Sequence, residues 1–182
     1  TLANEQIWTG FGELDFDGDD DYVNCGTDSS LNLTNSLTIG AWITPRTYGQ
    51  SGYGRIVDKG SSSTGFSFFL NEADNGLGYV TYGGSLVWSD SAVVTLNQQQ
   101  HIAVVYNELS STITFYVDGQ PAGSSNYQTN PIDSSNNPLY IGIRRYDMNR
   151  DFDGLIDDVR VYNRALSRTE IQQLYQSGQA TN

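Results

Sequence analysis

The sequence predicts an all-β fold in which two antiparallel sheets form a sandwich, with one short helix near the C-terminal end. Three observations lead to this prediction. Short segments alternate large apolar residues with small or polar ones, Gly, Asn, Asp and Ser separate these segments, and no strand–helix–strand alternation is found. We expect a single domain over residues 1–182, because no linker, charge block or internal repeat divides the chain.

The expected strands are short and closely spaced. The alternation is clear at 37–43, the period-two pattern of a half-buried strand. The segment 111–117 runs directly into Asp118-Gly119, a strong hairpin signal because both central turn residues take positive φ. The other expected strands are 65–70, 78–82, 102–106, 138–143 and 154–162.

One helix is expected after Ser167. The sequence Ser167-Arg168-Thr169-Glu170 has the capping-box pattern, in which the Ser hydroxyl accepts from the Glu170 amide and the Glu170 side chain reaches back. Three apolar residues follow at helical spacing on one face, namely Ile171, Leu174 and Tyr175. Gly178 is the expected left-handed residue that ends the helix.

Composition excludes several classes of function. With 9 Lys and Arg against 21 Asp and Glu, the net charge is −12, which disfavours nucleic acid and anionic membrane surfaces as partners. No apolar run reaches the roughly 20 residues of a membrane helix. Cys25 and His101 are the only residues of their kinds, so an internal disulfide, a Cys-based zinc site and a His cluster are excluded. Much Tyr, Ser and Asn with one Lys is typical of a secreted protein, so we expect an extracellular location.

Seven motifs occur in a characteristic order, at 16–23, 37–43, 55–60, 101–106, 115–119, 139–142 and 152–167. In this order they closely resemble the laminin-G-like jelly-roll domains of the concanavalin A-like lectin/glucanase superfamily. The resemblance covers residues 14–176 and implies a jelly roll, often with a calcium ion at its edge. It also implies a carbohydrate-binding or adhesion module attached to secreted enzymes. One departure is Gln99-Gln100-His101, where the family usually has Trp-His-His.

Two acidic clusters are candidate metal ligands. Five Asp residues fall within seven positions, from Asp15 to Asp21, and Asp157-Asp158 form a second group on the last expected strand. Like charges this close repel one another unless a cation neutralises them, and Ca²⁺ prefers oxygen ligands. Because first and last strands of a jelly roll commonly lie side by side, the two clusters could share one ion. Together with the resemblance, this predicts a structural Ca²⁺ held by Asp17, Asp19, Asp20, Asp157 and Asp158. The alternative is that these are solvated charges that prevent edge-to-edge pairing.

A weaker metal candidate is the segment 147–153, which opens with the D-x-N-x-D spacing of an EF-hand loop. Phe152 occupies the position where such a loop needs Gly, and Asp158 stands where a bidentate Glu should follow. We therefore interpret this segment as a polar loop between strands.

Two loops, 46–55 and 144–150, combine Tyr with Arg. Sugar rings bind aromatic platforms flanked by planar polar groups, so these loops are candidate glycan contacts. The predicted contacts are Tyr48, Tyr53, Arg55, Arg144, Arg145, Tyr146 and Arg150, with Trp88 as a further platform. Five of the eight Arg residues lie in these loops, which favours an anionic, uronate-bearing or sulfated polysaccharide. The alternatives are that the Arg residues pair with Asp58, Asp151 or Asp153, and that Trp88 faces the core.

The sequence lacks the usual catalytic patterns of this superfamily. None of the five Glu residues falls in the Glu-x-Asp-x-x-Glu arrangement of the related glucanases, and no G-x-S-x-G elbow is present. His101 heads an expected core strand and is interpreted as structural. We therefore expect a non-catalytic carbohydrate-binding module, tethered to a catalytic domain that degrades polysaccharide. The alternatives are a protein-binding adhesion domain and, less favoured, a polysaccharide hydrolase or lyase.

Overall fold

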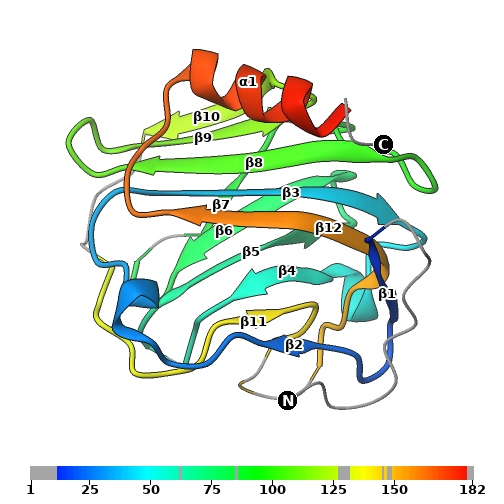
Figure 1. Ribbon diagram of the computed structural model, residues 1–182, viewed down its shortest axis with the longest axis horizontal. Helices are drawn as coiled ribbons and strands as arrows, with labels where there is room; N and C mark the ends of the chain where they lie inside the picture. Colours follow the sequence, from blue (N-terminus) through cyan, green and yellow to red (C-terminus); the bar gives the residue numbers. More distant parts are fainter. Residues whose placement is uncertain are drawn as a thin grey trace.

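The structure is a computed structural model that describes residues 12–61, 63–84, 86–126, 132–144, 146 and 149–179. Two antiparallel six-stranded sheets face each other, with β5, β6 and β7 lying behind β3 and β12 in the view of Figure 1. The first sheet has the order β1-β12-β3-β8-β9-β10, and the second has the order β2-β11-β4-β5-β6-β7. This arrangement confirms the predicted jelly-roll sandwich.

The first sheet consists of β1 (Leu14–Asp17), β3 (Leu37–Pro45), β8 (Gln100–Asn107), β9 (Thr112–Val117), β10 (Gln120–Asn126) and β12 (Asp153–Tyr162). The second consists of β2 (Val23–Asn24), β4 (Arg55–Asp58), β5 (Phe66–Asn71), β6 (Gly76–Thr81), β7 (Leu86–Trp88) and β11 (Tyr140–Ile141). Two 3₁₀ turns, η1 (Ser29–Leu31) and η2 (Gln50–Gly52), and the helix α1 (Arg168–Gln179) complete the described elements. No helix in the described ranges is long and apolar enough to cross a membrane.

The core lies between the two sheets and follows the alternation of the strands. On β8, Ile102, Val104 and Tyr106 are buried in the main core, whereas Ala103 and Val105 face outward. Each fully buried Phe, Leu or Ile contributes about 1.5–3 kcal/mol relative to exposure. The expected turn after β9 is confirmed, since Asp118 and Gly119 have φ of 48° and 72°.

Helix α1 packs on the outer side of β8 and β9, above the first sheet in Figure 1. The capping box is confirmed: the Ser167 amide donates to Glu170 Oε2 at 2.8 Å, and the Glu170 amide donates to Ser167 Oγ at 3.3 Å. The prediction that Gly178 ends the helix is wrong, because α1 continues to Gln179. Gly178 is needed there for close packing, since a Cβ would lie 2.1 Å from Trp42 Nε1.

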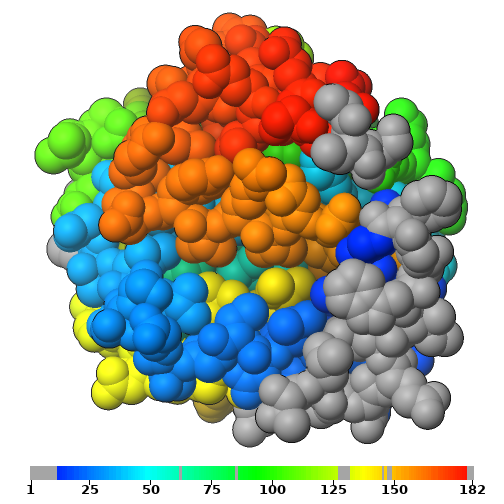
Figure 2. Space-filling view, in the orientation of Figure 1, coloured from blue at the N-terminus to red at the C-terminus, as the bar shows by residue number. Residues whose placement is uncertain are grey.

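The expected strand 138–143 is shorter than predicted, because β11 comprises only Tyr140–Ile141. Gly142 follows with φ of +89°, and a Cβ there would lie 2.3 Å from the Phe16 ring. The first and last strands lie side by side, as expected, and Leu14 pairs with Ile156. In Figure 2 the dark blue surface of β1 lies against the right-hand end of the orange surface of β12.

Candidate functional site

A pocket of about 330 Å³ opens on the outer face of the second sheet. The alternation that buries Phe68, Tyr79 and Val87 in the core directs their neighbours on β5, β6 and β7 outward. The lining residues are Tyr53, Arg55, Phe69, Val80, Tyr82, Leu86, Trp88, Arg144 and Arg150. Five of them, Tyr53, Arg55, Trp88, Arg144 and Arg150, are predicted contacts.

Three aromatic rings form a continuous platform in this pocket. The Phe69 and Trp88 rings meet edge to face at 5.8 Å, and Tyr53 stacks on Trp88 at 6.4 Å. The register explains why the two strand residues meet: Gly78 on β6 lies opposite both Phe69 and Trp88. A Cβ at Gly78 would lie 2.5 Å from Phe69 and 2.7 Å from Trp88, so the absent side chain is what lets the rings close over β6.

Arg55 lies at the base of the pocket and is only 2% exposed. Its Nη1 donates to the Tyr53 carbonyl at 3.0 Å, and its guanidinium lies 4.0 Å from the centroid of the Phe69 ring. The buried Asp58 is its counter-ion, with Oδ2 3.8 Å from Arg55 Nε. Burial, with smaller contributions from Arg150 and Arg144, lowers the pKa of Arg55 to about 10, although Tyr82 and Asp58 oppose this shift.

Arg144 and Arg150 complete the positive side of the pocket. The Arg150 guanidinium lies 4.9 Å from the centroid of the Tyr53 ring, a cation–π geometry. Arg144 donates to Asn149 Oδ1 at 3.4 Å. Burial, and then the charge of Arg150, lower the pKa of Arg144. With three Arg residues in its lining and Asp58 as the counter-ion of one of them, the pocket is locally positive in a protein of net charge −12.

The remaining predicted glycan contacts differ in position. Tyr146 is 65% exposed and borders an adjoining hollow of about 240 Å³ with Tyr82 and Arg144. Tyr48 lies away from the pocket, because its ring packs on the core and its hydroxyl donates to the Val94 carbonyl at 3.3 Å. Arg145 lies outside the described residues.

Sequence reasoning missed four lining residues, Phe69, Val80, Tyr82 and Leu86. Each lies on β5–β7 or just after β6, where alternation alone does not say which side faces the core. None of the described residues that line the pocket is Asp, Glu or His, so the carboxylate pair of a glycoside hydrolase is not among them.

A second, more polar hollow of about 520 Å³ lies beside the C-terminal end of α1. Trp42 and Tyr175 border it together with Gln98, Gln99, Asp118 and Gln179. Trp42 stacks on Tyr175 at 5.6 Å and is only 5% exposed, so it offers little ring surface to a ligand.

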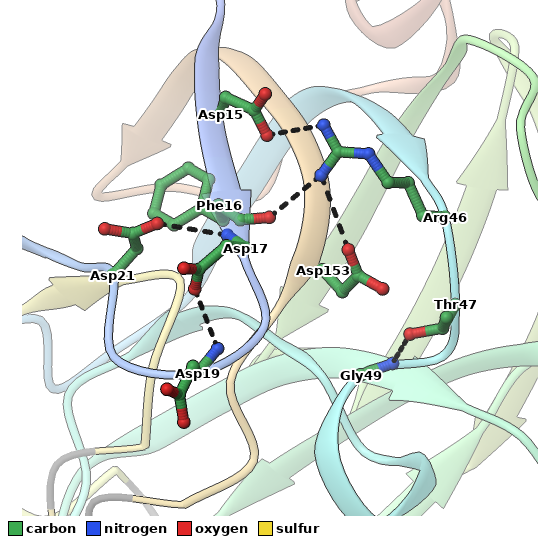
Figure 3. A network of polar contacts seen from close by, with 9 residues as sticks. All are labelled: Asp15, Phe16, Asp17, Asp19, Asp21, Arg46, Thr47, Gly49 and Asp153. Atoms are coloured by element: carbon green, nitrogen blue, oxygen red, sulfur yellow. Dashed lines mark hydrogen bonds and ion pairs between the residues drawn. The ribbon is translucent and has the colours of Figure 1, made fainter. Parts of the chain in front are cut away.

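The first acidic cluster surrounds the turn that follows β1. The Asp21 carboxylate accepts from the Asp17 amide at 3.0 Å, and the Asp17 carboxylate accepts from the Asp19 amide at 2.9 Å (Figure 3). Arg46 lies between Asp15, at 2.6 Å, and Asp153, at 3.4 Å (Figure 3). Part of the negative charge is therefore neutralised within the chain.

The second acidic cluster does not join the first. Asp17 pairs with Asp153, whereas Asp157 pairs with Trp42 four residues further along β12. Asp158 forms an ion pair of 2.8 Å with Arg160. The register therefore corrects the expectation that both clusters share one ion. Within the described ranges, no three Asp, Glu, His or Cys side chains already form a group that could hold a metal ion.

Asp151 is the last Asp of the D-x-N-x-D spacing in segment 147–153, and its burial was not expected from the sequence. It is 1% exposed, and neither carboxylate oxygen has a hydrogen-bond partner. Burial, together with the negative charges of Asp19, Asp20 and Asp17, raises its pKa to about 6. Asp151 thus lies beside the turn 17–21, and these oxygen donors fit the preference of Ca²⁺.

A family model described as the concanavalin A-like lectin/glucanases superfamily matches residues 17–172. The chain belongs to this superfamily. A search of curated protein sequences found no match.

Several solved structures that are similar to this chain are binding domains. The binding domain of Paraclostridial Mosquitocidal Protein 1 is similar with a TM-score of 0.77 and 18% identity, over 98% of this chain and 47% of that one. The CBM40 of the Ruminococcus gnavus IT-sialidase, bound to α2,3-sialyllactose, is similar with a TM-score of 0.72 and 12% identity. The similarity covers 91% of this chain and 98% of that one. The SAP-like pentraxin of Limulus polyphemus is similar with a TM-score of 0.66 and 16% identity, over 92% of this chain and 84% of that one. The chain spans about half the length of the binding domain of Paraclostridial Mosquitocidal Protein 1. At these identities, the likeness shows the shared fold.

Proposed function

We propose that this chain is a carbohydrate-binding domain and that the pocket on the second sheet is its binding site. The observation that carries the proposal is the platform of Tyr53, Phe69 and Trp88 beside the guanidinium groups of Arg55, Arg144 and Arg150. The half-buried rings of Tyr53 and Trp88 supply apolar area for a sugar face, and Arg144 and Arg150 supply directional donors. Phe69 and Arg55, each 2% exposed, support these groups from within the domain. The similar fold of a sialidase CBM40 supports this assignment.

The preferred ligand is an anionic polysaccharide that bears uronate or sulfate groups. Arg55, Arg144 and Arg150 line the pocket, and the buried Asp58 is the counter-ion of Arg55. A guanidinium group binds carboxylate or sulfate through two parallel hydrogen bonds, so anionic sugars gain more here than neutral ones. Of the expected alternatives, pairing with Asp applies to Arg55, which pairs with Asp58, and to Arg46, which pairs with Asp153. Among the described residues no ion pair joins Arg150 to Asp151.

The proposal has three further parts. The domain holds a structural Ca²⁺ at the edge where β1 meets β12, it is extracellular, and it is attached to a catalytic domain that degrades polysaccharide. Superfamily membership and the acidic edge support them. Binding to an insoluble or viscous polymer would raise the effective substrate concentration for the attached enzyme.

Affinity gel electrophoresis tests the proposal directly. Alginate, carrageenan and pectin would serve as anionic polymers, and laminarin, xylan and agarose as neutral or nearly neutral ones. We expect an anionic polymer to retard the domain, and Trp88→Ala to abolish the retardation. Leu109→Ala is the control, because Leu109 is 97% exposed in the turn between β8 and β9, on the other sheet.

The outcomes separate the alternatives. Retardation of wild type and Trp88→Ala alike would place the site elsewhere on the domain. Equal retardation by neutral and anionic polymers, without salt dependence, would contradict the anionic preference. No retardation by any polymer would contradict carbohydrate binding and favour a protein-binding adhesion domain.

A further inference from the structure

Two adjoining hollows share a wall made by Tyr82 and Arg144. These two residues line both the pocket of about 330 Å³ and the smaller hollow of about 240 Å³ beside it. Sites for small ligands usually occupy about 300–1,000 Å³, so the pocket lies at the lower end of that range and the second hollow lies below it. Each hollow therefore suits a short piece of a glycan, and together they offer consecutive places along one chain.

Tyr82 is firmly held in this wall. Its hydroxyl donates to Asp58 Oδ2 at 3.3 Å, and a Cβ at Gly60 would overlap its ring. The ring therefore packs directly over the backbone of Gly60 and has little room to move. A glycan that fills both hollows has to cross this wall, with one sugar on either side of it.

The two hollows differ in charge. Arg55, Arg144 and Arg150 line the pocket, whereas Arg144 alone is charged among the described residues that line the smaller hollow. Arg55 is buried against Asp58, so Arg144 and Arg150, which are both half-buried, are the groups positioned to meet a ligand. The described lining of the smaller hollow thus offers no cation of its own to a second anionic group.

Arg144 and Arg150 are suited to hold a single anion between them. A β-bridge between Arg144 and Asn149 brings the two ends of the loop 144–150 together. After burial, the charge of Arg150 is the largest influence that lowers the pKa of Arg144, so the two guanidinium groups are close enough to repel each other. A carboxylate or sulfate between them would relieve this repulsion and accept paired hydrogen bonds.

Tyr146 supplies the aromatic surface of the smaller hollow. It belongs to the same loop and is 65% exposed, so its ring is accessible to a ligand. An aromatic ring with a polar tip suits the apolar face and the hydroxyl rim of a sugar. The other residue that lines only this hollow, Ser61, is polar and uncharged. These features favour a neutral sugar in this position.

We propose that the site binds one repeating disaccharide in which a charged sugar alternates with a neutral one. The charged sugar lies on Tyr53 and Trp88, and its carboxylate or sulfate group lies between Arg144 and Arg150. The neutral sugar stacks on Tyr146. This inference rests on the proposed carbohydrate-binding function. It narrows the ligand from anionic polysaccharides in general to those that carry charge on every second sugar.

Oligosaccharides of equal length and different charge pattern test the proposal. Fragments of κ-carrageenan and hyaluronan carry a sulfate or a carboxylate on every second sugar, whereas oligogalacturonate carries a carboxylate on every sugar. Isothermal titration should give an affinity about tenfold or more higher for one of the alternating fragments than for oligogalacturonate. If oligogalacturonate binds as tightly as both alternating fragments, or more tightly, the charge pattern is overturned while the carbohydrate-binding function stands.

Tyr146→Arg separates the charge pattern from other differences between these sugars. It places a cation in the smaller hollow at an exposed loop position and leaves the core unchanged. The affinity for oligogalacturonate, relative to that for the alternating fragment, should rise about tenfold. Tyr146→Phe keeps the ring and should keep the wild-type ratio, as should the distant Leu109→Ala. An unchanged ratio in Tyr146→Arg would overturn the placement of a neutral sugar on Tyr146.

The length of the bound segment provides the second measurement. Affinity should rise from the charged monosaccharide to the alternating disaccharide and change by less than about threefold in longer fragments. Tyr146→Ala should lower the disaccharide affinity about tenfold and leave monosaccharide binding unchanged. A steady rise up to longer fragments would overturn the assignment of one disaccharide to the site. Absence of binding to every charged and neutral fragment would instead overturn the proposed function itself.

Discussion

The guanidinium group of Arg55 lies 4.0 Å from the centroid of the Phe69 ring, and both side chains are buried. Asp58, the counter-ion of Arg55 at 3.8 Å, is also buried. Tyr82 donates to Asp58 Oδ2 at 3.3 Å, and the Gly60 amide donates to Asp58 Oδ1 at 3.1 Å. One buried ion pair thus supports both the fold and the aromatic platform.

Replacing Arg55 with Met should destabilise the domain by about 3 kcal/mol, because Asp58 is then left buried without its counter-charge. The double variant Arg55→Met/Asp58→Asn should recover more than half of this loss. Urea denaturation of the four members of the cycle measures the coupling. A double variant no more stable than Arg55→Met would show that Asp58 does not depend on Arg55.

Replacing Gly78 with Ala should weaken glycan binding and lower stability by about 1–3 kcal/mol through overpacking. The new Cβ would lie 2.5 Å from Phe69 and 2.7 Å from Trp88, so the rings must separate. Gly40→Ala is the control, since its nearest neighbour would be 3.6 Å away, at ordinary contact distance. Wild-type affinity and melting temperature in Gly78→Ala would show that the platform tolerates this change.

Stability should fall as the pH drops from about 6.5 toward 4 because of His101. Burial lowers the pKa of His101 to about 4 in the folded state, from 6.5 when unfolded. In this window the unfolded chain binds a proton that the folded chain does not. This lowers the free energy of unfolding by up to about 3 kcal/mol. Nearby Asp158 opposes the lowering, and Arg160 adds to it.

The pH effect is measured as the difference between wild type and His101→Gln in urea denaturation at several pH values. Asp151 contributes a slope of opposite sign, because its raised pKa of about 6 makes the folded chain bind the extra proton as the pH falls. That contribution cancels in the comparison. Parallel pH profiles for the two proteins would mean that His101 does not titrate differently on folding.

Ser167→Ala should cost about 1 kcal/mol of stability, because it removes the hydroxyl that accepts from the Glu170 amide. Thr169→Ala, on the exposed side of the same turn, should have little effect. Chemical denaturation compares the two. Equal stability of both variants would mean that the cap does not contribute to the docking of α1.

Much of the fold was predictable because local signals agreed with the final packing. Alternation located β3, β5, β8 and β9, and the capping box located the start of α1. The polar strand β10 carries no such pattern, and its place is set by pairing with β9 across the turn. The role of Gly178 was also hidden, because its contact with Trp42 depends on how α1 lies on the sheet.

The site was predictable only in part, for a related reason. The Tyr and Arg content of two loops indicated Tyr53, Arg55 and Arg150. Phe69 carried no distinguishing signal, because an outward aromatic residue on a strand looks like a core residue until the packing is known. Asp151 is distinguished by burial without a partner, which a sequence does not display.

The pocket has two parts that are subject to different constraints in evolution. Phe69 and Trp88 belong to paired strands, where a change in length would shift every neighbouring residue pair. Tyr53, Arg144 and Arg150 lie outside the strands, in connections that tolerate substitution and changes of length. Related domains could therefore keep one aromatic floor and acquire new sugar specificities at its border. Libraries that vary only the connections would be an economical starting point for engineering new lectins on this scaffold.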